Sequence, residues 1–425
     1  MIRFLFKGLI RDKSRSLMPV LVVAIGVMLS VFLYCYLVGV MGDMIDFNAR
    51  FATGHVKIMT RAYAENEDQV PNDLALIKTD QLMERLEQEF PQMEWVERIK
   101  FGGLIDVPDE HRETRTQGTA AGMAFDLISE NSTEVERLNL HKALVKGRLP
   151  EKPDEVLLSE EFADKLEVTP GQTVTLISST MYGGMAIHNF QVCGTIKFGS
   201  SVLDRGGLVA DISGIRTALN MENACGEMLG YQKNSKNYND EEAAKIVSRF
   251  NKKYSHPDDE FSPFMKRLKE QSFLGEYLEL VDSMQGIVIT VFILIMSIVL
   301  WNTGLISGLR RYGEVGIRLA IGEEKGHIYK TMIYESVLIG IAGSIIGTAA
   351  GLGFAYWMQE AGIDISAMMR NNTMMMQSVF RANITPPAFY IGFIPGVFSI
   401  VLGTMLSGIG IYKRKTAQLF KELET

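Results

Sequence analysis

The chain has 425 residues, of which 43 are Lys or Arg and 50 are Asp or Glu, so its net charge is −7, and 47% of its residues are hydrophobic. Four uncharged stretches are each long enough to cross a bilayer, which takes about 20 apolar residues: Leu17–Met41, Ser283–Leu309, Ser336–Met358 and Ala388–Tyr412. This pattern excludes a soluble single-domain protein, a disordered chain, a coiled coil and a disulfide-rich secreted scaffold.

The N-terminal segment 1–16 precedes the first span. Its apolar residues recur at helical spacing among basic ones, which predicts an amphipathic helix on the inner membrane face, the alternative being a disordered basic tail. The apolar run at 17–41 is longer than that of a signal peptide, and no small-x-small cleavage motif follows it. We interpret it as a retained helix.

The charges orient the chain in the membrane. The short segments 1–16, 310–335 and 413–425 together carry +7, the large segment 42–282 carries −14, and the loop 359–387 is neutral. Basic short loops stay in the cytoplasm. Both termini and the 310–335 loop are therefore expected to be cytoplasmic, with 42–282 and 359–387 outside. An acidic outer domain predicts solubility and no nucleic-acid partner.

The outer segment mixes alternating and helical patterns, which predicts an α+β domain in two lobes, the second at about 146–215. Strands are expected at 55–59, 95–107, 117–125, 155–158, 173–177, 187–196 and 207–211. Helices are expected at 79–90, 160–166 and 239–254, the first two capped by Thr79 and Ser159. A stalk helix is expected at 262–282, from the helical spacing of Phe264, Leu268, Tyr277, Leu278 and Val281.

Motifs for catalysis and metal binding are absent from the sequence. It has no phosphate-binding P-loop, no Gly-x-Ser-x-Gly nucleophile elbow, no His-Glu-x-x-His, and six scattered histidines. We expect no catalytic, cofactor or metal site in this chain. The three cysteines are Cys35, Cys193 and Cys225, and their spacing leaves pairing of the last two open, although Cys193 lies in a strand pattern that predicts burial.

Small residues line one face of the third span. Gly343, Gly347 and Gly351 are four residues apart, and Gly340 precedes them. Such a stripe lets helix backbones approach closely, either within the chain or at a dimer seam, and both interpretations remain open. Pro19 and Pro395 are expected to perturb the first and fourth spans. Glu335, at the mouth of the third span, is expected to be solvated or paired with Lys330.

The segment 310–330 links the second and third spans. Val315, Leu319 and Gly322 recur at helical spacing among charges, which predicts a short helix parallel to the membrane. The alternative is a structureless basic loop.

This segment also carries a family resemblance. Arg311–Gly322, then Tyr334-Glu335-Ser336 and the glycines to Gly351, resemble the FtsX/MacB-type ABC-transporter permease module. The outer domain agrees with this through Gly147–Pro150, Asp154–Ser159, Gly171–Val174 and Phe190–Thr195, which resemble the family's periplasmic core domain. Gly54–Ile58, Gly194–Gly199, Leu203-Asp204 and Leu208-Val209 are most similar to the lipoprotein-releasing LolC/LolE branch.

The resemblance implies a permease in the bacterial inner membrane that binds no cofactor of its own. Its partners would be a separate cytoplasmic ATPase dimer of the LolD/MacB type, which holds ATP and Mg²⁺, a second copy or a paralogous permease, membrane lipids, and a periplasmic carrier or lipoprotein substrate. The 310–330 helix would be the coupling helix that docks on the ATPase, through Arg311, Glu314, Val315, Ile317, Arg318, Leu319 and Ile321. Movement would pass through the first two spans to the periplasmic domain, a mechanism called mechanotransmission.

Two further surfaces are expected to meet partners. In the LolC type a long Pro-containing hook binds a lipoprotein carrier, whereas here the hairpin 178–189 is short and has no Pro, which puts carrier binding at Met181, Tyr182, Gly183 and Gly184 in doubt. The loop 364–381 holds five methionines: Met368, Met369, Met374, Met375 and Met376. Methionine adapts to irregular apolar partners, so this loop either packs on the outer helix ends or forms a lip for acyl chains.

The functional hypotheses differ in class. The first is a permease that releases lipoproteins or moves another amphiphile, including MacB-like export of peptides or small amphiphiles. The second is an FtsX-like regulatory transducer that moves a periplasmic partner and transports nothing. The 241-residue outer segment is large for the second type, which favours transport.

Overall fold

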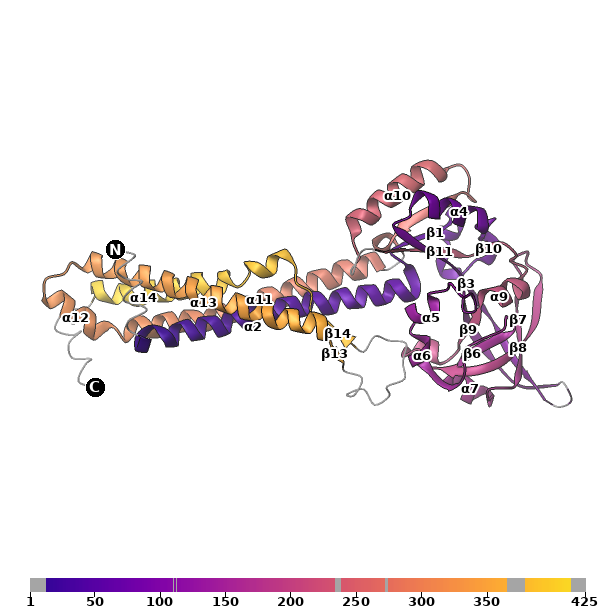
Figure 1. Cartoon of the computed structure of the whole chain (residues 1–425), viewed down its shortest axis with the longest axis horizontal. Helices are drawn as coiled ribbons and strands as arrows, with labels where there is room; N and C mark the ends of the chain where they lie inside the picture. Colours follow the sequence, from indigo (N-terminus) through magenta and orange to yellow (C-terminus); the bar gives the residue numbers. More distant parts are fainter. Residues whose placement is uncertain are drawn as a thin grey trace. The chain divides into compact units, whose positions relative to one another are not determined.

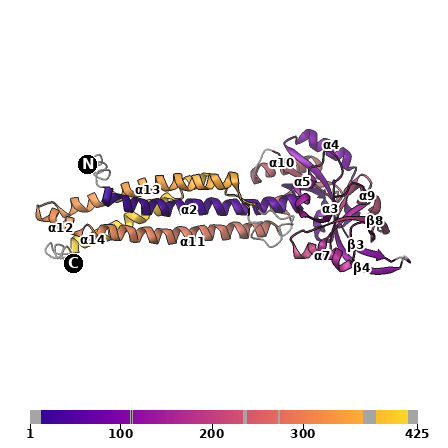
Figure 2. The same ribbon diagram turned by 60° about the horizontal axis from the view of Figure 1, so that its bottom comes forward.

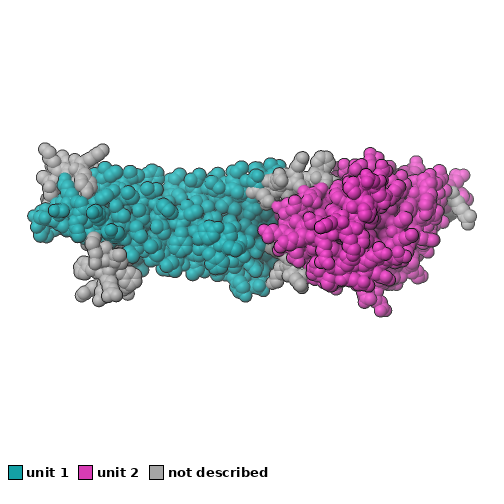
Figure 3. Space-filling view, turned by 90° about the horizontal axis from the view of Figure 1, so that it is seen from above, with its two compact units in different colours: residues 1–42, 280–363, 380–425 teal, residues 43–279, 364–379 magenta. Residues whose placement is uncertain are grey.

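The computed structural model describes residues 13–109, 111, 113–233, 238–271, 274–364 and 379–413 (Figure 1). Contacts divide the chain into two compact units, shown in Figure 3: unit 1 holds residues 1–42, 280–363 and 380–425, and unit 2 holds 43–279 and 364–379. Of the interfacial helix predicted at 1–16, residues 1–12 lie outside the described residues and 13–16 belong to the first long helix; the five methionines at 368–376 and the tail beyond 413 also lie outside the described residues.

Unit 1 is built from helices (Figure 2). They are α2 (Lys13–Asn48), α11 (Leu274–Leu309), α12 (Tyr312–Ala320), α13 (Lys325–Ala361), the 3₁₀ helix η5 (Pro386–Phe389), the π-helix η6 (Ile394–Ser399) and α14 (Ile400–Lys413). The ends of α2 and α11 beyond Gly42 and before Leu280 belong to unit 2. Among the described residues, four stretches are long and apolar enough to span a membrane: Leu17–Asp43, Ser283–Ala320, Lys325–Ala361 and Pro386–Ile409. These are the four predicted spans.

The membrane helices pack around an apolar cluster in which α2 contributes Val23, Val27 and Val31. Pro19 lies inside α2. Pro395 lies at the start of η6, where a missing backbone N–H and the wider π-turn coincide. By contrast, only 6% of the residues in the apolar window of the α11 span are buried, although Leu300 belongs to the apolar cluster and Ile289 and Ile293 pack against it.

Unit 2 is an α+β unit. Its strands are β1 (Val56–Thr60), β2 (Leu76–Ile77), β3 (Met93–Pro108), β4 (Thr114–Phe125), β5 (Leu144–Gly147), β6 (Glu155–Ser159), β7 (Thr173–Ser179), β8 (Met185–Ile196), β9 (Gly207–Asp211), β10 (Ala224–Cys225), β11 (Glu227–Gln232) and β12 (Pro263–Arg267). Its helices include α3 (Arg61–Glu65), α4 (Thr79–Glu89), α5 (Glu134–Arg137), α6 (Leu140–Ala143), α7 (Glu160–Leu166), α8 (Ser201–Asp204), α9 (Ile212–Leu219) and α10 (Asp240–Tyr254). The short helices η1 (Ala49–Thr53), η2 (Glu67–Gln69), η3 (Asn72–Leu74) and η4 (Leu268–Glu270) and the small strands β13 (Ile363–Asp364) and β14 (Val379–Phe380) complete the list.

The main sheet has the order β12-β1-β11-β3-β4-β9-β6-β8-β5, and β7 pairs with both β3 and β8. The strands β3, β4, β9, β6, β8 and β7 therefore close into a ring, with β4–β9 and β6–β8 as parallel pairs. The 16-residue β3 belongs to the ring through its second half and to β11 through its first half. Residues 43–279 fall in one compact unit, so the division into two lobes stays a prediction.

Local sequence explains several of these elements. Ser159 accepts a hydrogen bond from the Phe162 amide and caps α7, as predicted. Asn239 caps α10, which buries Ala243, Ile246, Val247 and Phe250 along one face. The β7–β8 hairpin has the predicted turn, where Gly183 has a φ of 78° that favours glycine.

Two local predictions were wrong. The segment at 263–267 is the strand β12, paired antiparallel with β1, and the helix α11 begins only at Leu274. Phe264 and Leu268 have helical spacing, but β1 has a free edge that this segment fills, so tertiary pairing overrides the pattern. At α4 the N-cap is Lys78 in a left-handed conformation, and Thr79 is the first helical residue.

Candidate functional site

The short helix predicted between the second and third spans is present as α12; its coupling role stays a prediction. Its inner face packs on unit 1, where Tyr312 and Val315 form an apolar cluster with Ile328 and Met332 of α13. Leu319 packs against this cluster from the next turn. The Tyr312 hydroxyl donates to the main-chain carbonyl of Ser407 on α14 over 2.5 Å. α12 is thus fastened to both following membrane helices.

The outer face of α12 carries the other predicted coupling residues. Ile317 is 48% exposed and Ile321, just after the helix, is 81% exposed, and Glu314 is exposed beside them. The guanidinium of Arg318 binds both carboxylate oxygens of Glu323, each over 2.6 Å. This bidentate pair closes the turn after α12, and its hydrogen bond holds the pKa of Glu323 below its usual value.

Glu335 was expected to be solvated or paired with Lys330, and its partner in the structure is a different one. Glu335 forms an ion pair with Arg311, which immediately precedes α12. Lys330 is exposed, whereas Arg311 and Glu335 are each 22% exposed. The planar, weakly hydrated guanidinium of Arg311 suits a partly buried ion pair better than the strongly hydrated ammonium of a lysine.

The glycine stripe of α13 packs within the chain. A Cβ placed on Gly343 would lie 2.7 Å from Val23, and one on Gly347 would lie 2.4 Å from the carbonyl oxygen of Ala24. Gly351 meets α2 in the same way, at Met28 and Val31, and Gly340 meets Gly396 and Ile400. Of the two interpretations, packing inside the chain accounts for these four positions, and the dimer seam is not needed to explain them.

The predicted partner hairpin ends in an exposed apolar tip. Tyr182 is 81% exposed and Gly183 and Gly184 form the open turn, whereas Met181 is buried and its amide bonds to Leu219. Met185 and Ile187 extend the exposed apolar surface along β8.

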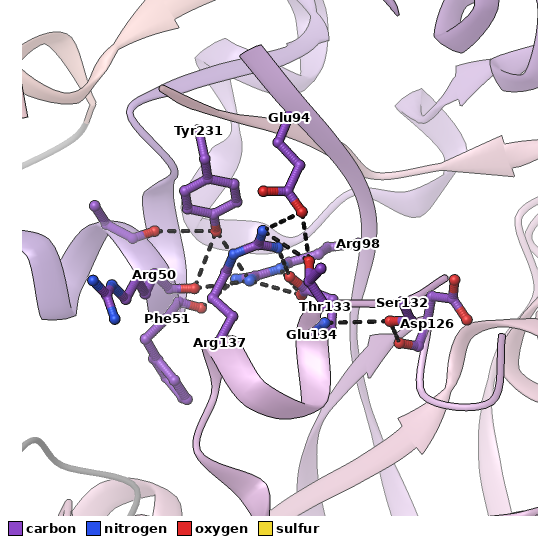
Figure 4. A network of polar contacts seen from close by, with 11 residues as sticks. Arg50, Phe51, Glu94, Arg98, Asp126, Ser132, Thr133, Glu134, Arg137 and Tyr231 are labelled. Atoms are coloured by element: carbon purple, nitrogen blue, oxygen red, sulfur yellow. Dashed lines mark hydrogen bonds and ion pairs between the residues drawn. The ribbon is translucent and has the colours of Figure 1, made fainter. Parts of the chain in front are cut away.

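The sequence did not point to a polar network at the end of α2 (Figure 4). There the guanidinium of Arg98, on β3, donates to the carbonyl of Phe51 over 2.6 Å and to that of Arg50 over 2.8 Å. It also contacts the hydroxyl of Tyr231, on β11, over 3.0 Å. Glu134 neutralises it at 2.8 Å, with both side chains almost fully buried.

A second arginine completes the network (Figure 4). Arg137 pairs with Glu134 and, over 2.7 Å, with Glu94, and its guanidinium lies 4.1 Å from the centre of the Tyr231 ring. Thr133 donates to Glu94 over 2.5 Å. Two arginines and two glutamates therefore balance in charge beside the carbonyls of η1. The only sequence signal was an arginine in β3 that alternates with the core residues Trp95 and Ile99, and an arginine at such a position resembles an ordinary surface charge.

Two titratable groups flank this network. Burial raises the pKa of Asp46 to about 6. Burial, with Arg50 and Arg137 nearby, lowers the pKa of His55 to about 4. His55 Nδ1 accepts a hydrogen bond from the amide of Gln232 over 3.0 Å, which requires an unprotonated nitrogen.

The cysteines at 35, 193 and 225 are each unpaired and buried. Burial raises the pKa of the Cys193 thiol to about 12. Within the described ranges, no group of three or more His, Cys, Asp or Glu side chains is arranged to hold a metal ion.

Comparisons with known proteins match both units. The family model "FtsX-like permease C-terminal" matches residues 286–416, and "MacB-like periplasmic core domain" matches residues 16–228. The chain is 31% identical over 96 residues to "Macrolide export ATP-binding/permease protein MacB 1/2" of Paracoccus denitrificans (strain Pd 1222), covering 23% of this chain and 14% of that protein. It is 38% identical over 71 residues to "Macrolide export ATP-binding/permease protein MacB" of Neisseria meningitidis serogroup A, covering 16% of this chain and 11% of that protein.

The chain therefore spans well under two thirds of the length of these two relatives. Among solved structures, the periplasmic region of MacB from Actinobacillus actinomycetemcomitans matches 52% of this chain and 91% of its own, with 14% identity and a TM-score of 0.34.

Proposed function

Because the chain belongs to the family of ABC-transporter permeases that join a MacB-like periplasmic core domain to an FtsX-like permease domain, we propose that it is the membrane subunit of an ATP-driven machine whose ATPase is a separate cytoplasmic protein. The large acidic unit lies in the periplasm, and both termini and α12 lie in the cytoplasm. The basic short segments support this orientation.

The observation that carries the proposal is the two-faced environment of α12. Its inner face is fixed to α13 and α14, while Ile317 and Ile321 project without burial. Two exposed isoleucines four residues apart, rimmed by charged residues, form a small apolar patch of the kind found at docking surfaces. The ATPase binds this face, and its closure moves the membrane helices and, through α2 and α11, the periplasmic unit.

Copurification with the ATPase tests the docking role. Replacing Ile317 and Ile321 together with Asp is expected to abolish retention of the ATPase by the tagged permease in nanodiscs. Ile77→Asp is the matched control, because Ile77 is 63% exposed but lies in unit 2. Full retention of the ATPase by the Ile317/Ile321 variant would contradict the proposal.

For the substrate, we propose lipoprotein release from the inner membrane, supported by the resemblance of 54–58 and 194–199 to that branch. The second candidate is export of a small amphiphile, which is favoured by the similarity to the macrolide export ATP-binding/permease proteins. Mass spectrometry of the purified ATPase–permease complex separates them: bound acylated protein supports release, and bound small molecules support export. Lipid alone, with ATP-dependent movement of a periplasmic partner, supports a regulatory transducer.

A further inference from the structure

In unit 2, residues 65–73 form a strap that connects α3 to β2. The buried residues Tyr63 and Ala75 anchor its two ends, whereas no residue of the strap itself is buried. Its main-chain hydrogen bonds, such as the one from the Val70 amide to the Glu67 carbonyl, close turns within the segment. Contacts of individual side chains therefore decide how firmly the strap is held on the rest of unit 2.

The strap supplies one of two carboxylates that neutralise a pair of lysines. The side chain of Lys57, on β1, is 1% exposed, and its Nζ lies 2.6 Å from Oε1 of Glu67 and 3.3 Å from Oε1 of Glu227. Lys100, on β3, pairs with the same oxygen of Glu227 over 2.9 Å. Two lysines and two glutamates thus balance in charge only while Glu67 is in place. Because the loss of one partner leaves a buried charge uncompensated, this ion pair holds the strap closed.

Other features of the closed strap oppose its closure. Val70 has a φ of 49° and a ψ of 57°, in the left-handed region, which is rare for a β-branched residue. It precedes Pro71, and a residue before proline favours extended backbone. Three buried polar atoms at the strap have no hydrogen-bond partner among the described residues: the Tyr63 hydroxyl, Oδ1 of Asn72 and Oε2 of Glu227. A buried polar atom without a partner costs free energy, which is recovered when the atom meets solvent.

We propose that the strap is a lid, held closed by the ion pair between Glu67 and Lys57. The strained turn and the unpaired polar atoms favour the open conformation, and the ion pair favours the closed one. In the open conformation Lys57 and Lys100 face Glu227 alone, so the lid controls access to a cationic site in an acidic domain. The inference goes beyond the proposed function, because opening of the strap requires neither ATP nor the ATPase.

Acetylation of Lys57 tests the lid, because solvent reaches this buried amine only when the strap opens. The full chain in phosphatidylcholine nanodiscs is treated with sulfo-N-hydroxysuccinimidyl acetate, and mass spectrometry compares Lys57 with the exposed Lys78. Glu67→Gln is expected to increase the rate at Lys57 at least about tenfold, since it leaves a buried charge uncompensated. The matched control is Asp68→Asn, which removes the same charge from the adjacent exposed residue and should react like the unmodified chain.

A second variant separates opening of the strap from a change in the amine itself. Val70→Asn leaves every charge in place, and asparagine tolerates the left-handed backbone, so Lys57 should react about two- to fivefold more slowly. Hydrogen exchange should show faster exchange of the strap in Glu67→Gln, with β1 still protected. Equal rates in the Glu67 and Asp68 variants would overturn the proposal. So would an unchanged rate in Val70→Asn, or a loss of protection in β1 together with the strap, since the strap would then not open on its own.

Discussion

The Nη1 atom of Arg98 lies 2.6 Å from the main-chain carbonyl oxygen of Phe51, where the chain leaves its first membrane-spanning helix (Figure 4). Carbonyls at the end of a helix have no amide partner within it and carry partial negative charge. A guanidinium held by the central strand of unit 2 satisfies two of them, at Arg50 and Phe51. The π-helix η1, which directly follows α2, is thereby bonded to the main sheet.

Replacing Arg98 with Met is expected to destabilise unit 2 by about 3–5 kcal/mol, because Glu134 would remain buried without one of its two arginines. Scanning calorimetry of the chain in nanodiscs should show the corresponding transition at least about 6 °C lower. Tyr231→Phe is the control, since it removes one hydroxyl from the same network at a cost of about 1 kcal/mol. A loss for Arg98→Met no larger than for Tyr231→Phe would show that the network is not cooperative.

The glycine stripe gives a prediction about membrane packing. Gly347→Ala is expected to destabilise unit 1 by about 1–3 kcal/mol, since its Cβ would overlap the Ala24 carbonyl of α2. Gly353→Ala, on the same helix, has no neighbour within 4 Å and is expected to be neutral or slightly stabilising. Thermal unfolding of both variants in nanodiscs makes the comparison. If Gly353→Ala were the more damaging, the helix would be packing through its other face.

The sequence predicted the helices and strands that a local pattern specifies. It did not predict those that depend on pairing between segments far apart in the chain. The β7–β8 hairpin and the face of α10 followed from alternation, turn glycines and helical spacing. The strand β12 was missed, since only its pairing with β1 distinguishes it from a helix. The closure of the strand ring depends on β3 meeting β7, about 70 residues away.

Among the site residues, too, those with a local sequence pattern were predicted and those defined by distant contacts were not. Val315 and Leu319 were predicted from spacing and lie on the packed face of α12. Arg98 could not be found, because its acceptors are main-chain carbonyls that carry no sequence signature.

The purified chain is expected to hydrolyse no ATP, because the sequence lacks the glycine-rich loop that binds phosphates. Phosphate release should match that of empty nanodiscs and rise only when the partner ATPase is added. The control is the same preparation with an ATPase whose P-loop lysine is replaced. Turnover above background without any copurified ATPase would contradict this expectation.

The ion pair after α12 gives a charge-swap prediction. Arg318→Glu places a second carboxylate against Glu323 and is expected to weaken coupling between substrate and ATPase activity, and Leu319→Pro should do so more strongly, as proline inside a helix costs about 3 kcal/mol. The double variant Arg318→Glu/Glu323→Arg restores the pair and should recover most coupling. Failure of the double variant to recover, with the permease folded, would assign Arg318 a direct contact with the ATPase.

The pH dependence of stability should reveal two opposing groups beside the network. The pKa of His55 is about 4 in the folded protein and about 6.5 in the unfolded chain. His55 therefore favours folding above pH 6.5, and this contribution is lost as the pH falls toward 4. The pKa of Asp46 is about 6 in the folded protein and about 3.8 in the unfolded chain. Asp46 therefore favours folding at low pH, and this contribution is lost as the pH rises through 6. Each effect is on the order of 3 kcal/mol.

The two groups change the free energy of unfolding with pH in opposite directions, and these changes nearly cancel between pH 4 and 6.5. Single variants should therefore separate them. His55→Asn keeps an acceptor for the Gln232 amide and should make the free energy of unfolding fall with rising pH, relative to the unmodified chain. Asp46→Asn should make it rise over the same range. Because all other carboxylates are shared by the three proteins, denaturant unfolding at pH 4.5, 5.5 and 6.5 isolates the two contributions. Parallel pH profiles for all three would mean that neither group titrates differently in the folded and unfolded chain.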